Sequence, residues 1–585
     1  MPLSARVLQY RNPARDRSER DERENEARRS YENEVVRQLD VLQQAVTTER
    51  ERVWKKGWEV EIERFYNLTE SLSPAPSFRP KVLIPECQTD MLHEASDLSD
   101  VSPIPYIIQK GLDDRQLTRE KAFQAQWKQS DYNLEFLKAT IWSLFAGNGY
   151  LRVAWDADAC NGEGEVVVCS YNPAHVYRDP YAMKDRDIKY VIFDDEMYLD
   201  DVRARWPENG WRIKYHRGGA SSSTRNKLSM PEGPMTITAT GGPIGMDSAV
   251  RPFASSDSRV IVRTAWVDDQ SSKLVRKPRS VSDPKWEMVY PNGRMIIECE
   301  GVILYDGGNP IPGKIKPIVT IWGTPPLFSA FAPAPIKYSK DLQELAERGY
   351  TQNYENAVRL NNGVWFIDEG TGIDLEDFGG VPAEAHMITS QSRIPECRWP
   401  QPMPAHMMEL PKVLLEKAEK VRGFTPSRRG ITAAGNVSAP LNDASILQSQ
   451  SLTRMRAKFL ANSFQRLAQI VFAMMGRFYL TKRTFPVFNE DKYEPVDWEA
   501  IPDFDPANWH IKIDENSIRP YSQTALRSMV PVMKQLGIID PETAMDLLDV
   551  PNKEVVLQRL REQASQAAQA KQQEAAAKAA AKGKK

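Results

Sequence analysis

The chain has 585 residues, of which 41% are hydrophobic and 27% charged, and its formal net charge is −2. These values are ordinary for a soluble globular protein and allow two to four domains with sizeable cores. A net charge near zero excludes a polycation that binds nucleic acid over its whole surface. Any contact with DNA must therefore come from local basic patches.

Five cysteines stand far apart in the sequence, without a CxxC pair. This pattern is typical of a reducing compartment and argues against both a disulfide framework and a zinc site. The N-terminus lacks the apolar segment of a signal peptide, and the most apolar helical run, 467–480, is too short and too polar to span a bilayer. The sequence therefore predicts a protein assembled in the cytosol, without a membrane partner.

The N-terminal part is predicted to be largely helical. Residues 1–35 mix arginine with acidic residues, which predicts a solvated helix or a disordered arm. From Tyr31 to about Tyr66 the apolar spacing predicts a helix. A second helical region begins at Thr118 and ends with Gly147 as its C-cap.

Strands follow these helices. The runs 150–155 and 165–171 predict a hairpin across a polar turn with an Asn-Gly pair at 161–162. Asp156, Asp158 and that asparagine suggest a calcium loop, but the glycine is displaced and no glutamate follows at the required distance. Turn chemistry explains the segment better.

A long mobile loop is predicted at 217–258, where glycine, serine, proline and threonine occur without a period. A strand follows at 259–267. The Pro-Asn-Gly turn at 291–293 predicts a second hairpin, between strands 286–290 and 294–299.

The second half has a different organisation. Two helices flank a small insert with short strands, and a basic loop and a long helix follow. In chain order these segments are 336–361, 364–404, 407–423, 424–440 and 442–483.

The long helix is the central element of this prediction. Asn442 or Asp443 can cap its start, and no proline interrupts it before Pro486. At 1.5 Å per residue, some forty residues span roughly 60 Å. Its charge is almost entirely basic. Such a helix is typical of a strut in a large assembly.

After Pro486 the sequence predicts a link rich in proline and aspartate, then a strand at 510–513. Helices are expected at 521–536, at 541–548 and from Lys553 onward. An alanine, glutamine and lysine tract at 567–585 predicts a solvated helix or a disordered tail.

The motifs of common enzymes are missing from the sequence. It contains no P-loop, no GxSxG elbow and no HExxH pair, and its six histidines are isolated. The acidic run 194–196 is interpreted as a solvated strand end and not as an acid–base pair. We therefore expect a structural part and not an enzyme, without a cofactor and without a metal.

Several segments, in order, resemble the portal (head–tail connector) proteins of tailed bacteriophages. The resemblance covers roughly residues 60–560, and its specificity lies in the order of many weak motifs. The segments that carry it are Asn172–Pro180, Tyr190–Ile192, Met197–Pro207, Tyr290–Arg294, Tyr338–Arg483 and Gln535–Asp540.

The resemblance implies an α+β portal fold and a dodecameric ring whose channel passes double-stranded DNA without sequence specificity. Implied partners are the terminase large subunit, the major capsid protein and the head–tail adaptor or tail proteins. The implied location is one capsid vertex of the virion, after assembly in the host cytoplasm. The implied parts are an N-terminal arm and wing (1–335), stem helix 1 (336–361), a clip (362–406), stem helix 2 (407–423), a tunnel loop (424–440), the long helix and the rest of the wing (441–520), and a crown with a C-terminal tail (521–585).

Positive charge on a flexible loop suits a channel in which DNA must move, because attraction to phosphates carries no sequence information. Arg428 and Arg429 are the first candidates to line the channel, with Lys420 and Arg422 beside them. An alternative stays open, in which these arginines pair with acidic residues of a neighbouring subunit.

Two further groups of residues have more than one interpretation. The long helix carries a basic group, Arg454, Arg456 and Lys458. We interpret it as a solvated or salt-bridged face in preference to a DNA contact. In the insert, Trp365 and Trp399 are either local core or contacts with the packaging ATPase.

Two other function classes remain as alternatives. One is a DNA-processing enzyme of the packaging apparatus, a nuclease or ATPase. The other is a minor head or scaffold protein without a channel.

Overall fold

A computed structural model describes residues 13–67, 82–99, 105–108, 114–213, 259–274, 286–361, 364–366, 396–398, 401–424, 451–489, 492–498, 510–513 and 530. The chain forms two compact units. The first comprises Met1–Ile431 and Ser449–Ile518, and the second Thr432–Gln448 and Arg519–Lys585. In the second unit only Val530 is described, so the account below concerns the first.

A five-stranded antiparallel sheet is covered by the N-terminal helix α1 (Pro13–Trp54). Val35, Leu39 and Val46 on α1 are buried in one cluster with Ile192 and Ala265 of the sheet. These α1 residues recur at helical spacing, so they form one apolar face. The strand order is β10 (Val302–Gly308), β9 (Arg294–Cys299), β6 (Arg259–Val267), β5 (Tyr190–Tyr198) and β4 (Val176–Arg178).

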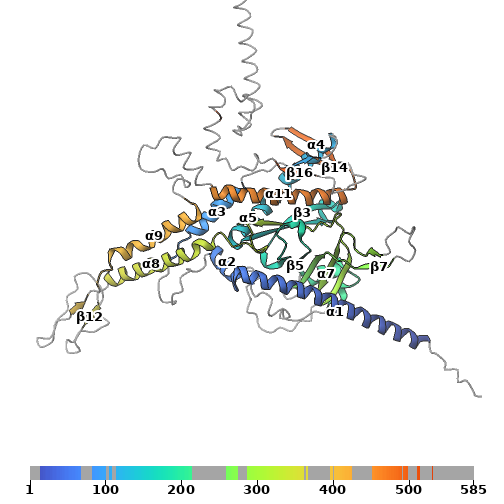
Figure 1. Cartoon of the computed structure of the whole chain (residues 1–585), viewed down its shortest axis with the longest axis horizontal. Coiled ribbons are helices and arrows are strands. Elements are labelled where there is room, and N and C mark those ends of the chain that lie inside the picture. The colour runs from blue at the N-terminus through green and yellow to red at the C-terminus, as the bar shows by residue number, and fades with distance from the viewer. Residues whose placement is uncertain are drawn as a thin grey trace, which may run out of the picture. The chain divides into compact units, whose positions relative to one another are not determined.

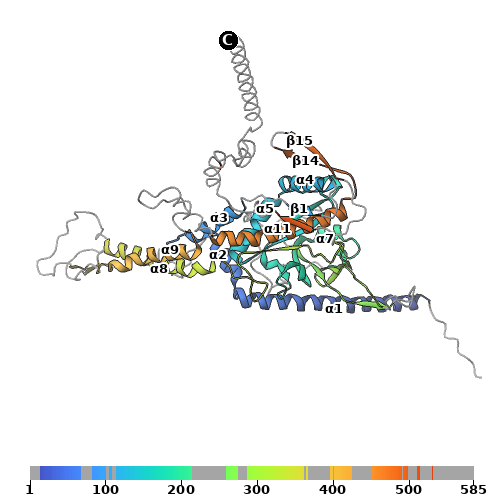
Figure 2. The same cartoon turned by 45° about the horizontal axis from the view of Figure 1, so that its top comes forward.

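A three-stranded sheet packs against the long helix α11 (Ser451–Phe478), as Figures 1 and 2 both show. Its order is β11 (Ile318–Trp322), β2 (Asn148–Asp156) and β3 (Glu165–Tyr171). Helices α4 (Asp114–Gln129) and α5 (Tyr132–Ala146) add aromatic side chains to the same core.

The remaining elements are further helices and paired strands. The helices are α2 (Trp58–Asn67), α3 (Glu86–Ser99), α6 (Ala159–Gly162), α7 (Leu199–Arg205), α8 (Lys337–Asn361), α9 (Ala405–Arg422) and the 3-10 turns η1 (Pro173–His175), η2 (Asp185–Asp187) and η3 (Gly210–Arg212). The two-stranded ribbons are β1 (Pro105–Ile108) with β16 (His510–Ile513), β7 (Ser272–Leu274) with β8 (Trp286–Met288), β12 (Val364–Phe366) with β13 (Glu396–Arg398), and β14 (Arg483–Asn489) with β15 (Lys492–Trp498).

The mixed helix and sheet content confirms the predicted α+β class. Hairpin β2–β3, strand β6 and helices α8 and α9 lie where the sequence predicts them. Gly147 ends α5 with a φ of 104°, a conformation open to glycine. The helix predicted over 31–66 is interrupted, because Lys55 and Gly57 have φ values of 69° and 81° and separate α1 from α2.

The second predicted hairpin is wrong. β8 pairs with β7 and not with β9, and β9 forms its hairpin with β10. The turn is Glu300-Gly301, with φ values of 49° and 81°. Positive φ at both residues defines the type I′ turn that suits a tight hairpin.

The long helix ends earlier than predicted. α11 stops at Phe478, and β14 begins at Arg483. The Tyr479 hydroxyl accepts hydrogen bonds from the Gln126 amide (3.0 Å) and the Val166 backbone N–H (3.2 Å), so the core holds this side chain where the helix ends. The described α11 has 28 residues, about 42 Å at the standard rise. The predicted caps Asn442 and Asp443 lie outside the described residues.

The first part of the predicted link is wrong, because strands β14 and β15 occupy most of residues 483–498, whereas 499–509 lie outside the described residues. Pro486 and Pro495 stand opposite each other in the ribbon β14–β15. The strand at 510–513 is confirmed as β16. The predicted loop 217–258 and tail 567–585 lie outside the described residues, as do the helices predicted after residue 520, apart from Val530, which is helical.

Within the described ranges, no three acidic, histidine or cysteine side chains gather so that they could hold a metal ion. None of the described helices combines the length and apolar composition of a bilayer span. Cys87, Cys160, Cys169 and Cys299 are free thiols.

Candidate functional site

Helices α8 and α9 lie side by side, as both ribbon views show (Figures 1 and 2). They run antiparallel, because Gly349 faces Pro411 and the Asn353 amide donates to the Met408 carbonyl at 3.4 Å. A Cβ atom at Gly349 would lie 2.6 Å from the Cγ of Pro411. Glycine is therefore what allows the two helices to approach so closely at this point.

Small and apolar side chains fill the space between the helices. Ala346 and Ala418 are fully buried, and Leu415 nearly so. The buried Pro411 stands inside α9, where it removes one backbone hydrogen bond. The two helices therefore pack closely, although α9 lacks one backbone hydrogen bond at Pro411.

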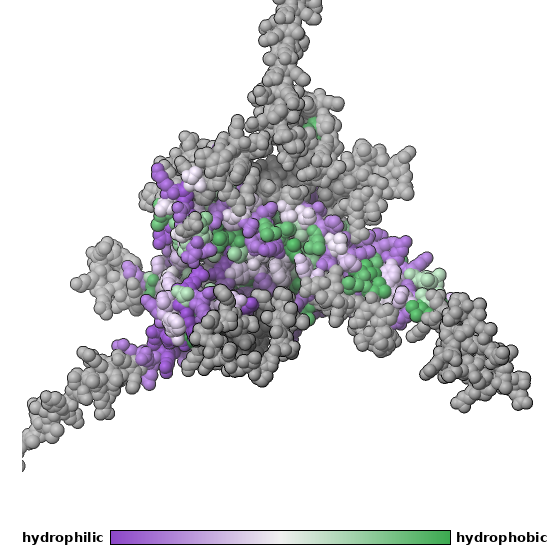
Figure 3. Space-filling view, turned by 180° about the vertical axis from the view of Figure 1, so that it is seen from behind, coloured by the Kyte–Doolittle hydropathy of each residue, from purple (hydrophilic) through white to green (hydrophobic). Residues whose placement is uncertain are grey.

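The outer faces of the pair carry large apolar residues that no described segment covers. Nine such side chains are 41–58% exposed: Tyr338, Leu345, Tyr354, Val358, Met407, Met408, Leu410, Val413 and Val421. Hydrophobic residues of the α8–α9 pair are visible on the right of Figure 3. Large exposed apolar side chains gathered on one pair of helices indicate an interaction site.

A polar face of α8 binds the segment 82–87. Gln343, Glu347 and Thr351 are four residues apart, so they form one row on the helix. All three are buried, and their bonds to the backbone of 82–87 measure between 2.6 and 3.4 Å. This row fixes the N-terminal half of α8 to the segment that leads into α3.

Asp90 on α3 binds the end of α9. Its carboxylate accepts a hydrogen bond from the Arg422 Nε at 2.8 Å, and the Arg422 Nη2 lies 2.6 Å from the same oxygen as an ion pair. Both side chains are 1% exposed. Arg422 also contacts the Cys87 thiol, whose pKa burial raises to about 11, so this thiol remains protonated at neutral pH.

Glu94, one helical turn further along α3, binds the start of α11. It forms a buried ion pair with Arg456 and accepts from the Thr453 hydroxyl at 3.3 Å. The Arg456 Nε donates to the Gly323 carbonyl at 3.0 Å. α3 thus holds both helices that flank residues 425–450.

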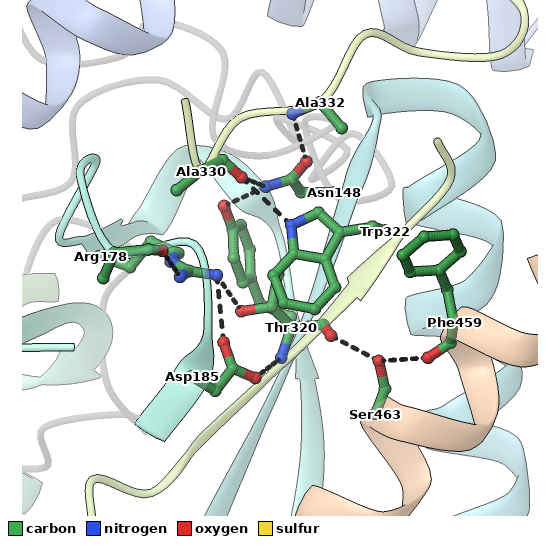
Figure 4. A network of polar contacts seen from close by, with 11 residues as sticks. Asn148, Arg178, Asp185, Thr320, Trp322, Ala330, Ala332, Phe459 and Ser463 are labelled. Carbon is green, nitrogen blue, oxygen red and sulfur yellow. Dashed lines mark hydrogen bonds and ion pairs between the residues drawn. The ribbon is translucent and has the colours of Figure 1, made fainter. Parts of the chain in front are cut away.

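A buried polar network ties α11 to the sheets beneath it (Figure 4). Arg178 is completely buried and donates to Asp185 (3.1 Å) and Thr320 (2.6 Å). The Ser463 hydroxyl of α11 donates to the Thr320 carbonyl at 2.6 Å. Because every link is a hydrogen bond between buried groups, the network fixes one register of α11 on β11.

The structure places the predicted channel residues differently. Lys420 is exposed on the last turn of α9. The prediction that Arg422 lines the channel is wrong. Arg422 is buried and paired with Asp90 of the same chain, so it does not face a channel. Arg428 and Arg429 lie outside the described residues.

The remaining predicted residues are only partly described. Trp365 stands on β12 opposite Cys397, and Trp399 lies outside the described residues. On α11, Arg454 and Lys458 are exposed and Arg456 is salt-bridged, as expected for a solvated or paired face.

Sequence reasoning missed the two carboxylates of α3. Asp90 and Glu94 occupy the same face as Cys87, Met91 and Leu98, all of them buried. Two acidic residues on an otherwise apolar helical face are the signal for buried ion pairs, since unpaired charges are rarely buried.

Comparisons with known proteins agree with the resemblance noted in the sequence. The matching family is described as the phage P22-like portal proteins, and the match covers residues 117–585. No curated protein matches the chain.

Among solved structures, one match is described as the neck of an empty GTA particle computed with C6 symmetry. It has 11% sequence identity and a TM-score of 0.38, over 85% of this chain and 95% of that one. This similarity is too low to support an argument. The family match alone spans most of the sequence, and with it the chain belongs to the phage P22-like portal protein family.

Proposed function

We propose that copies of this chain assemble into a dodecameric ring at one capsid vertex and that double-stranded DNA passes through its channel. The ring serves packaging and later ejection. It docks the terminase large subunit first and the head–tail adaptor or tail proteins afterwards, and it contacts the major capsid protein. Assembly takes place in the host cytoplasm. The chain itself catalyses nothing, and the terminase hydrolyses ATP.

The observation that carries the proposal is the exposed apolar surface of the α8–α9 pair. The two helices bury apolar side chains in the interface between them. Large apolar side chains also stand exposed on the faces away from this interface. Further copies of the same pair would cover that surface on both sides. A repeated head-to-tail contact of this kind closes into a ring when its rotation closes.

The proposal divides the chain by function. The α8–α9 pair forms the stem around the channel, and α1, α11 and the sheets form the wing. Residues 362–406 form the clip, 424–440 the tunnel loop, and 521–585 the crown and tail.

For contact with DNA we propose Lys420 together with Arg428 and Arg429. Lys420 is exposed close to the end of α9, after which the chain continues into the segment with the two arginines. Each lysine or arginine that neutralises a phosphate releases a counterion, so binding weakens as salt rises. The logarithm of the binding constant falls linearly with the logarithm of the salt concentration. Replacing all three residues by glutamine should make this slope shallower by the equivalent of up to about three neutralised phosphates. Lys412→Gln, also exposed on α9, is the matched control and should leave the slope unchanged.

For the clip we propose that Trp365 and Trp399 contact the packaging ATPase. Trp365→Ala and Trp399→Ala should then reduce co-sedimentation of the terminase with assembled rings. Rings that form and bind the terminase as the wild type does would contradict this contact, and loss of the rings themselves would instead assign these tryptophans to the local core.

Negative-stain images of the purified full-length protein test the proposal as a whole. Rings with a central hole are the expected result. Monodisperse monomers would contradict it, as would nuclease or ATPase activity of the isolated chain, which favours a DNA-processing enzyme.

A further inference from the structure

A cavity of about 560 Å³ lies between α11, the loop around η2 and the segment after β11. Figure 4 labels three of the residues that line it, Trp322, Phe459 and Ser463. The residues on which the argument rests are Lys184, Arg186, Trp322, Pro325, Pro326 and Arg466.

The charge that lines this cavity is mainly positive. Among the described residues, the Arg466 Nε is buried and has no hydrogen-bond acceptor. Burial lowers the pKa of Arg466, and the carboxylate of Asp185 opposes that shift. Lys184 and Arg186 add two exposed cations, of which Arg186 forms an ion pair with Asp187 at 3.5 Å.

Asp185, the acidic residue of the lining, is already engaged on both of its oxygens. Its Oδ1 accepts from Arg178 at 3.1 Å and its Oδ2 from the Thr320 N–H at 2.8 Å. The cavity therefore offers cations whose charge the described side chains do not fully balance. A guanidinium whose Nε is buried without an acceptor is stabilised by an anion that it can hydrogen-bond.

The two loops that line the cavity also carry strongly exposed apolar side chains, close in sequence to the lining residues. Leu327 and Phe328, which follow the two lining prolines, are 74% and 91% exposed, and Tyr181 on the opposite loop is 80% exposed. The Ala330 N–H donates to the Pro180 carbonyl at 2.9 Å and joins the two loops. Aromatic and apolar groups around a polar centre are the anatomy of a protein–protein interface.

We propose that this cavity is a socket for an aspartate or glutamate side chain of a neighbouring copy of this chain. Arg466 binds the incoming carboxylate, and Tyr181, Leu327 and Phe328 pack against the surface around it. A free anion would gain nothing from these three apolar side chains, whereas a protein surface would bury them. The inference rests on the proposed ring, because it requires a second copy beside the first.

Assembly of charge variants gives the first test. Arg466→Glu should raise the concentration needed for assembly at least tenfold in mass photometry, since the socket would repel a carboxylate. Arg477→Glu, exposed on the same helix two turns beyond the cavity residue Gln469, should assemble as the wild type does. Phe328→Ser keeps the test valid if the Arg466 variant folds poorly, because a side chain that is 91% exposed contributes little to folding. It should also weaken assembly.

Zero-length crosslinking gives the second test. Arg466→Lys places an amine in the socket, and a carbodiimide joins an amine to a carboxylate in direct contact. In rings mixed from isotopically light and heavy chains, the peptide containing position 466 should be linked to an acidic peptide of the other label. A link to Asp185 of the same chain alone, or no link, would overturn the inference.

Two outcomes separate this inference from the proposed function. If the wild-type chain forms no rings, the proposed function fails. If rings form and Arg466→Glu assembles normally, only the socket fails. Titration with inorganic phosphate completes the comparison: Arg466-dependent phosphate binding without any effect on assembly would identify a free-anion site and overturn the socket.

Discussion

Arg422 shows how a charged residue that looks functional in the sequence can be structural in the fold. Its partner Asp90 lies 332 positions away, so local sequence offers no hint of the pair. Both groups are buried, and a buried charge that loses its partner costs about 3–5 kcal/mol. The pair therefore holds α9 against α3.

Asp90→Ala should loosen the contact between the end of α9 and α3. We expect amides in the last turn of α9 to exchange hydrogen faster by a factor that corresponds to about 3–5 kcal/mol of lost local stability. Hydrogen-exchange mass spectrometry measures it directly. Lys420→Ala, exposed on the same turn, is the control and should leave exchange unchanged; equal protection in both variants would mean that the ion pair does not hold the helix.

A second residue-scale prediction concerns acid. Glu32 on α1 accepts two hydrogen bonds from Arg212, at 2.6 and 2.7 Å, and these bonds lower the pKa of Glu32 below its usual 4.5. A lowered pKa stabilises the fold above pH 4.5, and that contribution is lost as the pH falls through the folded-state value.

Glu32→Gln should therefore lower the thermal midpoint at neutral pH, and its difference from the wild type should shrink below pH 4.5. Differential scanning fluorimetry across the acid range measures both. The exposed Glu26→Gln is the control. A difference that stays constant with pH would show that the carboxylate charge is not what Arg212 binds.

At the scale of elements, helices were predictable and strand partners less so. The 3.6-residue period located α8, α9 and most of α11. The hairpin was misassigned because Pro-Asn-Gly at 291–293 and Glu-Gly at 300–301 are both turn sequences, and only the register of β9 on β6 decides between them. That register is a long-range contact.

The prolines of β14 and β15 led to the wrong prediction of a link for a related reason. Proline argues against a central strand, but both strands of a two-stranded ribbon are edges, and at a position whose N–H would face outward a proline costs no ladder bond. Sequence alone does not reveal that the ribbon has only two strands.

The seam between α8 and α9 gives a prediction at this scale. Gly349→Ala should destabilise the pair by about 1–3 kcal/mol, because its Cβ would meet the Pro411 ring, although alanine favours a helix by up to about 1 kcal/mol. Pro411→Ala in the same chain removes the ring and should restore the loss. A double-mutant cycle on thermal stability measures the coupling, and additive effects would mean that the two residues do not meet.

The outer faces of the pair give another prediction. Leu345→Glu with Val413→Glu should leave the circular dichroism spectrum unchanged and lower the mass of the assembly, because both side chains are about half exposed. Glu416→Lys, exposed on α9, is the charged control and should assemble normally. A double variant that still assembles as the wild type does would exclude these faces as the stem interface.

For the whole molecule, the order of segments predicted more than any single motif did. The sequence indicated a portal protein, and the family match over residues 117–585 confirms it. The candidate site was predicted only in part. Helices α8 and α9 were found, but Asp90 and Glu94 on α3, which hold α9 and α11, were not, because they act through contacts far apart in the chain.

The central claim is that α8 and α9, repeated around an axis, enclose a channel for DNA. A cryo-electron microscopy reconstruction of the assembled full-length chain tests it most directly. The account predicts a closed ring in which α8–α9 pairs pack side by side around a hole wide enough for a duplex. A ring whose hole is lined by other elements, or an assembly in which the α8–α9 pairs of neighbouring copies do not touch, would contradict it.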